Sequence, residues 1–373
     1  MLAGAAYLAF ALADKGSDRV RMRKRKITVS AVRRIALHIL GGCALLGAIA
    51  SPAKAASDDS ALFEQLRASD LEMATIGWRL ASSNAPLCDI LEPGLGLQVH
   101  TLDQFAPQLR DSAQRHFKFA TAVAVEGVVA GSPAAQAGLR ADDSLVRIGP
   151  IDITAIAGKP GTTQRLVAVQ LAVAKLPPAE PIEIQAIRDG TPLTVTVRSV
   201  PACRSRFELE LADDFGASAD GSMVQVSSKL VETYRGDRAV AAIAHEFSHN
   251  ILHHRARLEA RGVTFGMLSG FGGNVKYFRQ TEIQADILSV YLLTNAGYDP
   301  KAAPDFWRDF GPNHAGSIFN SRSHPHWRDR IATLEAEITR IQADPARPHV
   351  SKLIAERDQP LDGDWQSLLV RHR

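Results

Sequence analysis

Two histidines four residues apart are the first residues of this sequence that could carry out chemistry. His245 and His249 flank Glu246 in the pattern H-E-x-x-H, within a stretch that has helical spacing. Side chains four positions apart project from one face of a helix, so both imidazoles can bind one metal ion while the carboxylate reaches a water on that ion. Neutral imidazole suits zinc, and a catalytic zinc site keeps one position open for water. The pattern predicts that His245 and His249 bind zinc and that Glu246 is a general base.

Glu282 and Asp286 are carboxylates that could complete this site from a second helix. They stand one turn apart in the stretch EIQAD. We expect Glu282 to be the third ligand of one zinc ion per chain, and Asp286 to accept the second ring N–H of a ligating histidine. Acidic residues are also favoured at the start of any helix, so this interpretation depends on the H-E-x-x-H pattern upstream.

The other histidines of this region lack a carboxylate at metal-ligand spacing. His253 and His254 follow one turn after His249. We predict that they are solvated residues of one continuous helix over residues 237–257. His314 and His326 are given no role.

The order of motifs in residues 207–341 resembles a known family. H-E-x-x-H followed by E-x-x-A-D, then NAGYDP at 295–300 and NSRSHP at 320–325 with Arg330 after it, is similar to the gluzincin metallopeptidases of the HtpX, Oma and CAAX prenyl endopeptidase family, including its exported BepA-like members. The resemblance implies an α+β fold, with a mainly helical zincin domain and a small edge-strand sheet. It also implies zinc-dependent cleavage of peptide bonds.

The family resemblance implies further site residues. His324 and Arg330 are equal candidates for stabilising the oxyanion that forms during hydrolysis. Residues 219–230 stand where the family has its substrate-binding edge strand. An extended peptide is therefore expected to lie antiparallel to four residues of that strand, Met223, Val224, Gln225 and Val226.

Residues 91–202 have a different texture, with short β-like runs broken by glycine. G-L-G-L at 94–97, GSPAAQAGL at 131–139, a D-x-L-x-x-I-G strand and R-D-G at 188–190 together resemble a PDZ domain. The resemblance implies binding of an extended peptide by strand addition, with its C-terminal carboxylate held by the loop amides of Gly94, Leu95, Gly96 and Leu97. Alternatively, the glycines only mark turns in a small β domain that spaces or gates its neighbour.

Residues 1–55 have the pattern of a secretory signal peptide. A basic cluster at 23–26 precedes an apolar run at 35–50, and a small-x-small site ends at Ala55. Met22 is an alternative start. A lipoprotein signal at Cys43 and a single membrane anchor stay open as alternatives, although the apolar run is short for a bilayer. The leader predicts export to the periplasm and a mature chain that does not span the membrane.

Removing the leader changes the charge balance and the cysteine count. The full sequence has 43 Lys and Arg and 40 Asp and Glu, of which the leader carries ten and two. The remaining 33 basic and 38 acidic residues give a net charge of about −5, which leaves no footprint for nucleic acid. Two of the three cysteines remain, Cys88 and Cys203. In an exported chain they are expected to form a disulfide, with two separate buried thiols as the alternative.

The predicted organisation has five parts. After the leader come a helical segment at 56–90 that packs on the catalytic domain, a β-rich PDZ-like domain at 91–202, a zinc metallopeptidase domain at 203–345 and a partly ordered tail at 346–373. We expect an endopeptidase that acts on unfolded or extended envelope proteins, in quality control or processing. The alternative is a peptide-binding adaptor or chaperone with a latent or structural zinc site, for which Glu246 would have no use.

Overall fold

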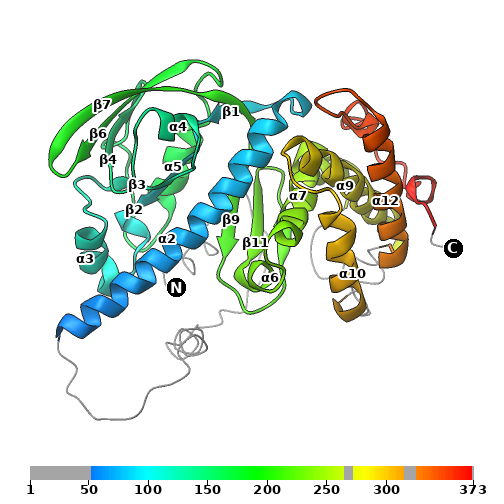
Figure 1. The fold of residues 1–373 in the computed structure, drawn as a ribbon, viewed down its shortest axis with the longest axis horizontal. Helices are drawn as coiled ribbons and strands as arrows, with labels where there is room; N and C mark the ends of the chain where they lie inside the picture. Colours follow the sequence, from blue (N-terminus) through cyan, green and yellow to red (C-terminus); the bar gives the residue numbers. More distant parts are fainter. Residues whose placement is uncertain (1–51, 264–271, 315–324, 372–373) are drawn as a thin grey trace, which may run out of the picture.

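The computed structural model describes residues 52–263, 272–314 and 325–371, which form an α+β fold (Figure 1). Nearly all of the predicted signal peptide, with Met22 and Cys43, lies outside the described residues. In the described part, no helix is long and apolar enough to cross a membrane.

A single long helix, α2 (Pro52–Ser83), runs across both halves of the molecule (Figure 1). It contacts strands β8 and β9 and helix α9 on the helical side, and helix α3 and strands β2 and β3 on the β-rich side. Phe63 is buried among aromatic residues of the β-rich half, whereas Leu80 is buried in the core of the helical half. The predicted helical segment therefore packs on both halves, not on the catalytic half alone.

Residues 91–202, which were expected from their sequence to resemble a PDZ domain and are called the PDZ-like unit for that reason alone, are built on an antiparallel sheet. The strand order is β2-β3-β4-β6-β7, with β5 paired to β4. The strands are β2 (Leu97–Thr101), β3 (Val123–Val128), β4 (Ser144–Ile148), β5 (Ile151–Asp152), β6 (Pro181–Arg188) and β7 (Thr191–Arg198). Its helices are α3 (Pro107–His116), α4 (Pro133–Gln136) and α5 (Gln164–Val173), the last lying against β2.

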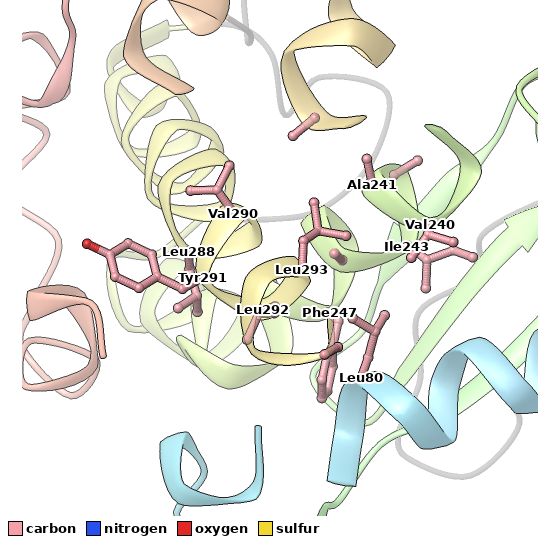
Figure 2. Packing of buried hydrophobic residues seen from close by; sticks show 14 of the residues in the cluster. Leu80, Val240, Ala241, Ile243, Phe247, Leu288, Val290, Tyr291, Leu292 and Leu293 are labelled. Atoms are coloured by element: carbon pink, nitrogen blue, oxygen red, sulfur yellow. The ribbon is translucent and has the colours of Figure 1, made fainter. Parts of the chain in front are cut away.

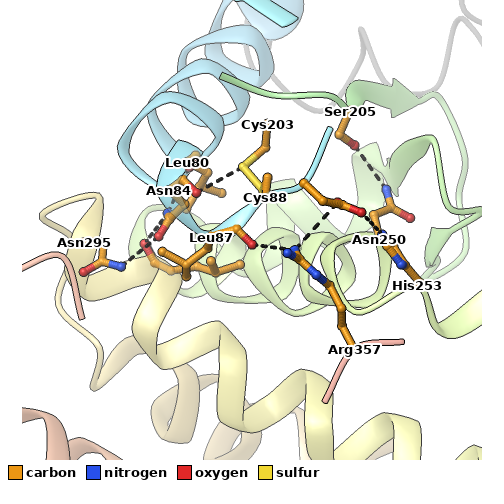
Figure 3. Close-up of a disulfide and its surroundings, with 12 residues drawn as sticks. Leu80, Asn84, Leu87, Cys88, Cys203, Ser205, Asn250, His253, Asn295 and Arg357 are labelled. Carbon is orange, nitrogen blue, oxygen red and sulfur yellow. Dashed lines mark hydrogen bonds and ion pairs between the residues drawn. A yellow bond between two sulfur atoms is a disulfide. The ribbon is translucent and has the colours of Figure 1, made fainter. Parts of the chain in front are cut away.

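The two ends of the PDZ-like unit meet at a short ribbon. Strand β1 (Leu91–Gly94) pairs antiparallel with β8 (Val200–Cys203). Beside this ribbon Cys88 and Cys203 form a disulfide with their Cα atoms 5.5 Å apart (Figure 3). The chain thus enters and leaves the unit at one point, where both ends are tied to the rest of the molecule.

The helical half begins with a three-stranded sheet whose order corrects a prediction. β11 (Met223–Ser227) lies in the middle, antiparallel to β10 (Ala217–Ala219) and parallel to β9 (Arg206–Glu210). The expectation that residues 223–226 form the free edge is wrong, because both sides of β11 are paired. The cause is the turn at Asp220, whose carboxylate accepts the backbone N–H groups of Ser222 and Met223 and folds β10 back onto β11.

The helices of this half pack around α7 and α9. They are α6 (Ser228–Thr233), α7 (Asp237–Ile251), α8 (His254–Ala260), α9 (Val275–Asn295), α10 (Ala302–His314) and α12 (Trp327–Ala343). Phe247 and Ile243 of α7 join Leu288 and Leu292 of α9 in one core, to which α2 adds Leu80 (Figure 2). This packing fixes the distance between the helices that carry the predicted zinc ligands.

Two expectations about chain continuity are wrong. The predicted single helix over residues 237–257 is broken, because His253 adopts a left-handed conformation with φ 53° between α7 and α8. The tail at 346–373, expected to be only partly ordered, packs against the rest of the described chain, since Leu353 and Leu361 are buried. Arg357 of this segment donates to the carbonyl of Leu87 at 2.8 Å (Figure 3).

Candidate active site

Helices α7 and α9 bring the three predicted zinc ligands together. Nε2 of His249 lies 3.3 Å from Nε2 of His245. The Glu282 carboxylate approaches these nitrogens at 3.4 Å from His245 and 3.7 Å from His249. The three donor atoms lie within 4.8 Å of one another. Two imidazoles and one carboxylate that converge in this way fit a catalytic zinc ion with an open coordination position.

The sequence of α7 explains why this helix can lie so deep. Its residues before the motif, 239–244, are small or apolar, and all of them are buried. Small side chains let the helix approach α9 and the sheet closely. His245 and His249 are each only about one-seventh exposed as a result, with side chains 14% and 15% accessible.

A buried carboxylate and a buried guanidinium stand behind His245. Nδ1 of His245 lies 3.0 Å from Oδ1 of Asp286, at ion-pair distance although not in ideal hydrogen-bond alignment. Arg330 donates to both oxygens of Asp286, at 2.5 and 2.7 Å, and is only 1% exposed. Burial alone would raise the pKa of Asp286, but the charge of Arg330 and the contact with His245 hold that pKa below its ordinary value. Asp286 is thus an ionised partner for the ring of His245.

Glu246 has the environment of a general base. It is half-buried and faces the cavity in front of the ligands. Burial raises the pKa of Glu246 to about 7, against the opposing charges of His245 and Arg330. A carboxylate whose pKa lies near the working pH can both accept and return a proton.

A cavity of about 790 Å³ opens in front of Glu246 and Glu282. Ala241 and Ala242 of α7 line the cavity with small side chains. Residues 215–217, which end at the first residue of β10, line it as well. A further part of the lining, called the aromatic wall below, comprises Phe306, Trp307, Phe310, Trp327 and Trp365. None of Met223, Val224, Gln225 and Val226 is among the described residues that line the cavity, whereas Ala217 of β10 lines it.

Sequence reasoning missed the aromatic wall. Trp365 comes from the segment predicted as a tail, where its Trp ring lies 4.9 Å from the guanidinium carbon of Arg279. Phe306 and Phe310 stack 5.2 Å apart on α10. The four-residue spacing of these two phenylalanines indicates that they lie on the same face of the helix. The neighbouring sequence does not indicate that this face borders the zinc ligands.

His254 was predicted to be solvated, and this is wrong. Its ring is 1% exposed, with Nδ1 2.9 Å from Nδ1 of His249 and Nε2 3.1 Å from Oε1 of Gln284. The break at His253 turns the chain and places the ring behind the ligand. His253 itself is partly exposed and contacts Asp358 at 3.0 Å.

The other predicted site residues lie elsewhere. His324 lies outside the described residues, and Arg330 is placed behind Asp286 as described above. The segment Gly94, Leu95, Gly96 and Leu97 borders a second cavity of about 230 Å³, shared by the PDZ-like unit, α2 and β9. In that segment the N–H of Leu95 already donates to the carbonyl of Pro93 at 3.0 Å.

Part of the chain is similar to known metalloendopeptidases. The chain is 25% identical over 144 residues to the mitochondrial metalloendopeptidase OMA1 of Schizosaccharomyces pombe, covering 33% of this chain and 43% of that protein. It is 26% identical over 129 residues to the mitochondrial metalloendopeptidase OMA1 of Arabidopsis thaliana, covering 30% of this chain and 27% of that protein. The chain thus spans less than half the length of either relative.

A solved structure, an HtrA-type protease AlgW with decapeptide, aligns with 30% of each chain at 25% identity, but its TM-score of 0.23 is too low to bear on the fold. Residues 263–338 match the model of Peptidase family M48. This match includes Glu282, Asp286 and Arg330, and the H-E-x-x-H pattern stands just before it. This match and the convergence of His245, His249 and Glu282 support a zinc metallopeptidase site similar to those of family M48.

Proposed function

We propose that this protein is a zinc-dependent endopeptidase that cleaves extended polypeptides. The observation that carries the proposal is the position of Glu246, which lies between the two histidine ligands, faces the large cavity and has a pKa of about 7. A purely structural metal site has no use for such a carboxylate.

Each residue of this site has its own role in peptide hydrolysis. When bound, zinc supplies a Lewis acid that activates a water and polarises the substrate carbonyl. Glu246 takes the proton of the attacking water and delivers it to the leaving amine. Asp286, held by Arg330, keeps the ring of His245 in place.

His324 and Arg330 are the two residues that the sequence offers for stabilising the oxyanion. Two nitrogens of Arg330 donate to Asp286, and Nη2 also lies 3.4 Å from Glu282. Because these contacts commit the guanidinium to the ligands and their partner, we favour His324 for the oxyanion.

The substrate is proposed to add as a strand to β10. This strand is an edge of its sheet, and the adjoining residues 215–217 border the cavity. Strand addition recognises a backbone, which suits an unfolded protein, and the aromatic wall suits an apolar side chain beside the scissile bond.

We also propose that the protein works after export, in the periplasm, on misfolded or maturing envelope proteins. The leader pattern and the Cys88–Cys203 disulfide support this location, because disulfides persist in oxidising compartments. Quality control or processing follows from the location and from the choice of an extended substrate.

The test is Glu246→Gln in the full-length protein, with zinc content measured and reduced casein as substrate. We expect cleavage to fall by about 10²- to 10⁴-fold while zinc is retained. The matched control is Glu232→Gln, an exposed residue of α6, which should cleave as the wild type does. Undiminished cleavage by Glu246→Gln would overturn the peptidase mechanism.

The second candidate is a peptide-binding adaptor that uses the PDZ-like unit. The cavity bordered by Gly94 to Leu97 and α5 favours it, because a PDZ domain binds peptides between such a loop, its strand and its helix. Fluorescence anisotropy with one peptide in free-carboxylate and amidated forms tests this idea. Equal binding of the two forms would remove carboxylate recognition by Gly94, Leu95, Gly96 and Leu97.

A further inference from the structure

The second histidine ligand has a partner of an unusual kind. The ring of His249 is backed by another imidazole, since its Nδ1 lies 2.9 Å from Nδ1 of His254. His245, in contrast, is backed by the carboxylate of Asp286. Two nitrogens at hydrogen-bond distance require that one carries the proton and the other offers its lone pair.

Arg257 and Gln284 decide which nitrogen of His254 carries the proton. Oε1 of Gln284 accepts from Nη1 of Arg257 at 3.2 Å, and a guanidinium can only donate. The same oxygen lies 3.1 Å from Nε2 of His254. An amide oxygen can only accept, so Nε2 of His254 carries a proton.

The remaining nitrogen of His254 must then act as the acceptor. The ring of His254 is 1% exposed and lies against the imidazole of His249 and the amide of Gln284, which also holds the cationic Arg257. A second positive charge here would be buried without an opposite charge in hydrogen-bond contact, so the ring is neutral. A neutral ring protonated at Nε2 has its lone pair on Nδ1. His249 therefore donates its Nδ1–H to His254 and keeps the lone pair of Nε2 toward His245 and Glu282.

The break between α7 and α8 makes this contact possible. In an uninterrupted helix, residues five positions apart point about 140° away from each other. The left-handed conformation of His253 ends α7 and lets His254 fold back behind His249. Arg257 is anchored in turn to the C-terminal segment, because its Nε donates to the carbonyl of Gln359 at 2.9 Å.

We propose that His254 is a positioning residue that fixes His249 in the tautomer able to bind zinc through Nε2, with Gln284 and Arg257 setting the direction of the hydrogen bonds. The inference rests on the proposed zinc site but not on peptide cleavage. Zinc affinity should therefore depend on a hydrogen-bond acceptor at the position of Nδ1 of His254.

The experiment measures zinc affinity of the full-length protein by competition with a chromophoric chelator. His254→Phe keeps an aromatic ring but removes the acceptor, and it should weaken zinc binding by about 10- to 100-fold, as loss of such partners does. His254→Asn places an amide oxygen near the Nδ1 position and should restore affinity toward the wild-type value. His253→Asn is the matched control, because it changes the adjacent histidine, tolerates the left-handed conformation and should leave affinity unchanged.

A second measurement separates positioning from support of the fold. The visible spectrum of the cobalt-substituted protein should change in His254→Phe and be recovered in His254→Asn, whereas a loss of packing alone would not be rescued by the smaller residue. If His254→Phe does not fold, Gln284→Met removes the accepting oxygen at similar bulk and should weaken zinc binding in the same direction.

Wild-type affinity in His254→Phe, or in Gln284→Met where that variant replaces it, would overturn the proposal. Equal losses in His254→Phe and His254→Asn would do the same. Because affinity is measured without substrate, these outcomes are independent of whether Glu246→Gln abolishes cleavage.

Discussion

Phe207 of β9 packs edge-on against Phe247, the residue that follows Glu246 in the zinc motif, with ring centroids 5.1 Å apart. On its other side Phe207 lies against Gly77 of α2, where an added Cβ would stand 2.6 Å from the ring. The long helix that supports the PDZ-like unit is therefore connected to the zinc-binding helix through one aromatic side chain. Phe207 also borders the second cavity beside residues 94–97.

Gly77→Ala should destabilise the protein by about 1–3 kcal/mol, because the added methyl forces Phe207 toward Phe247 in a packed core. Chemical denaturation measures the change. Gly273→Ala is the matched control, since an added Cβ there meets nothing within 4 Å and the φ of this glycine is not positive. Equal stability of the two variants would show that Phe207 has room to move.

Arg330→Met should cost about 3–5 kcal/mol of folding free energy, because it leaves the buried carboxylate of Asp286 without its partner. The variant should also bind zinc more weakly, since Asp286 positions His245. Arg255→Met is the control for losing an arginine from an exposed ion pair, here with Glu259, and should cost no more than about 0.5 kcal/mol. A similar small loss in both variants would mean that the Asp286 pair is not effectively buried.

A carboxyl pair between α2 and β3 predicts a stability that falls as the pH rises. Burial raises the pKa of Asp70 from 3.8 to about 6, and burial together with the charge of Asp70 raises the pKa of Glu126 well above its ordinary value. Between pH 3.8 and about 6, Asp70 keeps its proton in the folded state but loses it in the unfolded state. The free energy of unfolding therefore decreases as the pH rises through this range.

Asp70→Asn should remove part of this dependence, and it should stabilise the protein at pH 8 by on the order of 1 kcal/mol relative to its effect at low pH. Urea denaturation at the two ends of the window measures the difference. Asp111→Asn, an exposed residue of α3, should alter stability little at either pH. A larger gain from Asp70→Asn in acid than at pH 8 would contradict the direction of the shift.

Trp365→Ala should impair cleavage without loss of zinc, because this side chain lines the cavity and is not one of the proposed zinc ligands. We expect kcat/KM for an apolar peptide to fall by roughly tenfold, which corresponds to about 1.4 kcal/mol. Val370→Ala, an exposed position of the same segment, should leave kcat/KM unchanged. Wild-type kinetics for Trp365→Ala would place the substrate in another part of the cavity.

Helical periodicity made the zinc ligands predictable. His245 and His249 lie four residues apart, and Glu282 and Asp286 repeat the same spacing, so each pair shares a face whatever surrounds it. The family pattern then linked the two helices. What periodicity could not supply was the single left-handed residue, His253, that ends α7 and reverses the prediction for His254.

Long-range contacts were the other limit of the sequence. The strand at 223–227 was found, but its place in the sheet depends on the turn at Asp220 and on β9, which pairs from an earlier segment. The prolines in the last part of the chain favoured the prediction of a tail at 346–373. In the structure Leu361 of this segment is buried and Trp365 lines the cavity. Asp70 and Glu126 meet from distant positions, and nothing near either one in the sequence signals the other.

Zinc restoration of the metal-free, full-length protein tests the central claim most directly, by recording the rate of casein cleavage against zinc added. The rate should rise linearly, level off at one zinc per chain, and stay near zero for Glu282→Ala at the same total zinc. Full cleavage before zinc is added, or equal restoration in Glu282→Ala, would contradict the assignment of His245, His249 and Glu282 as the catalytic metal site.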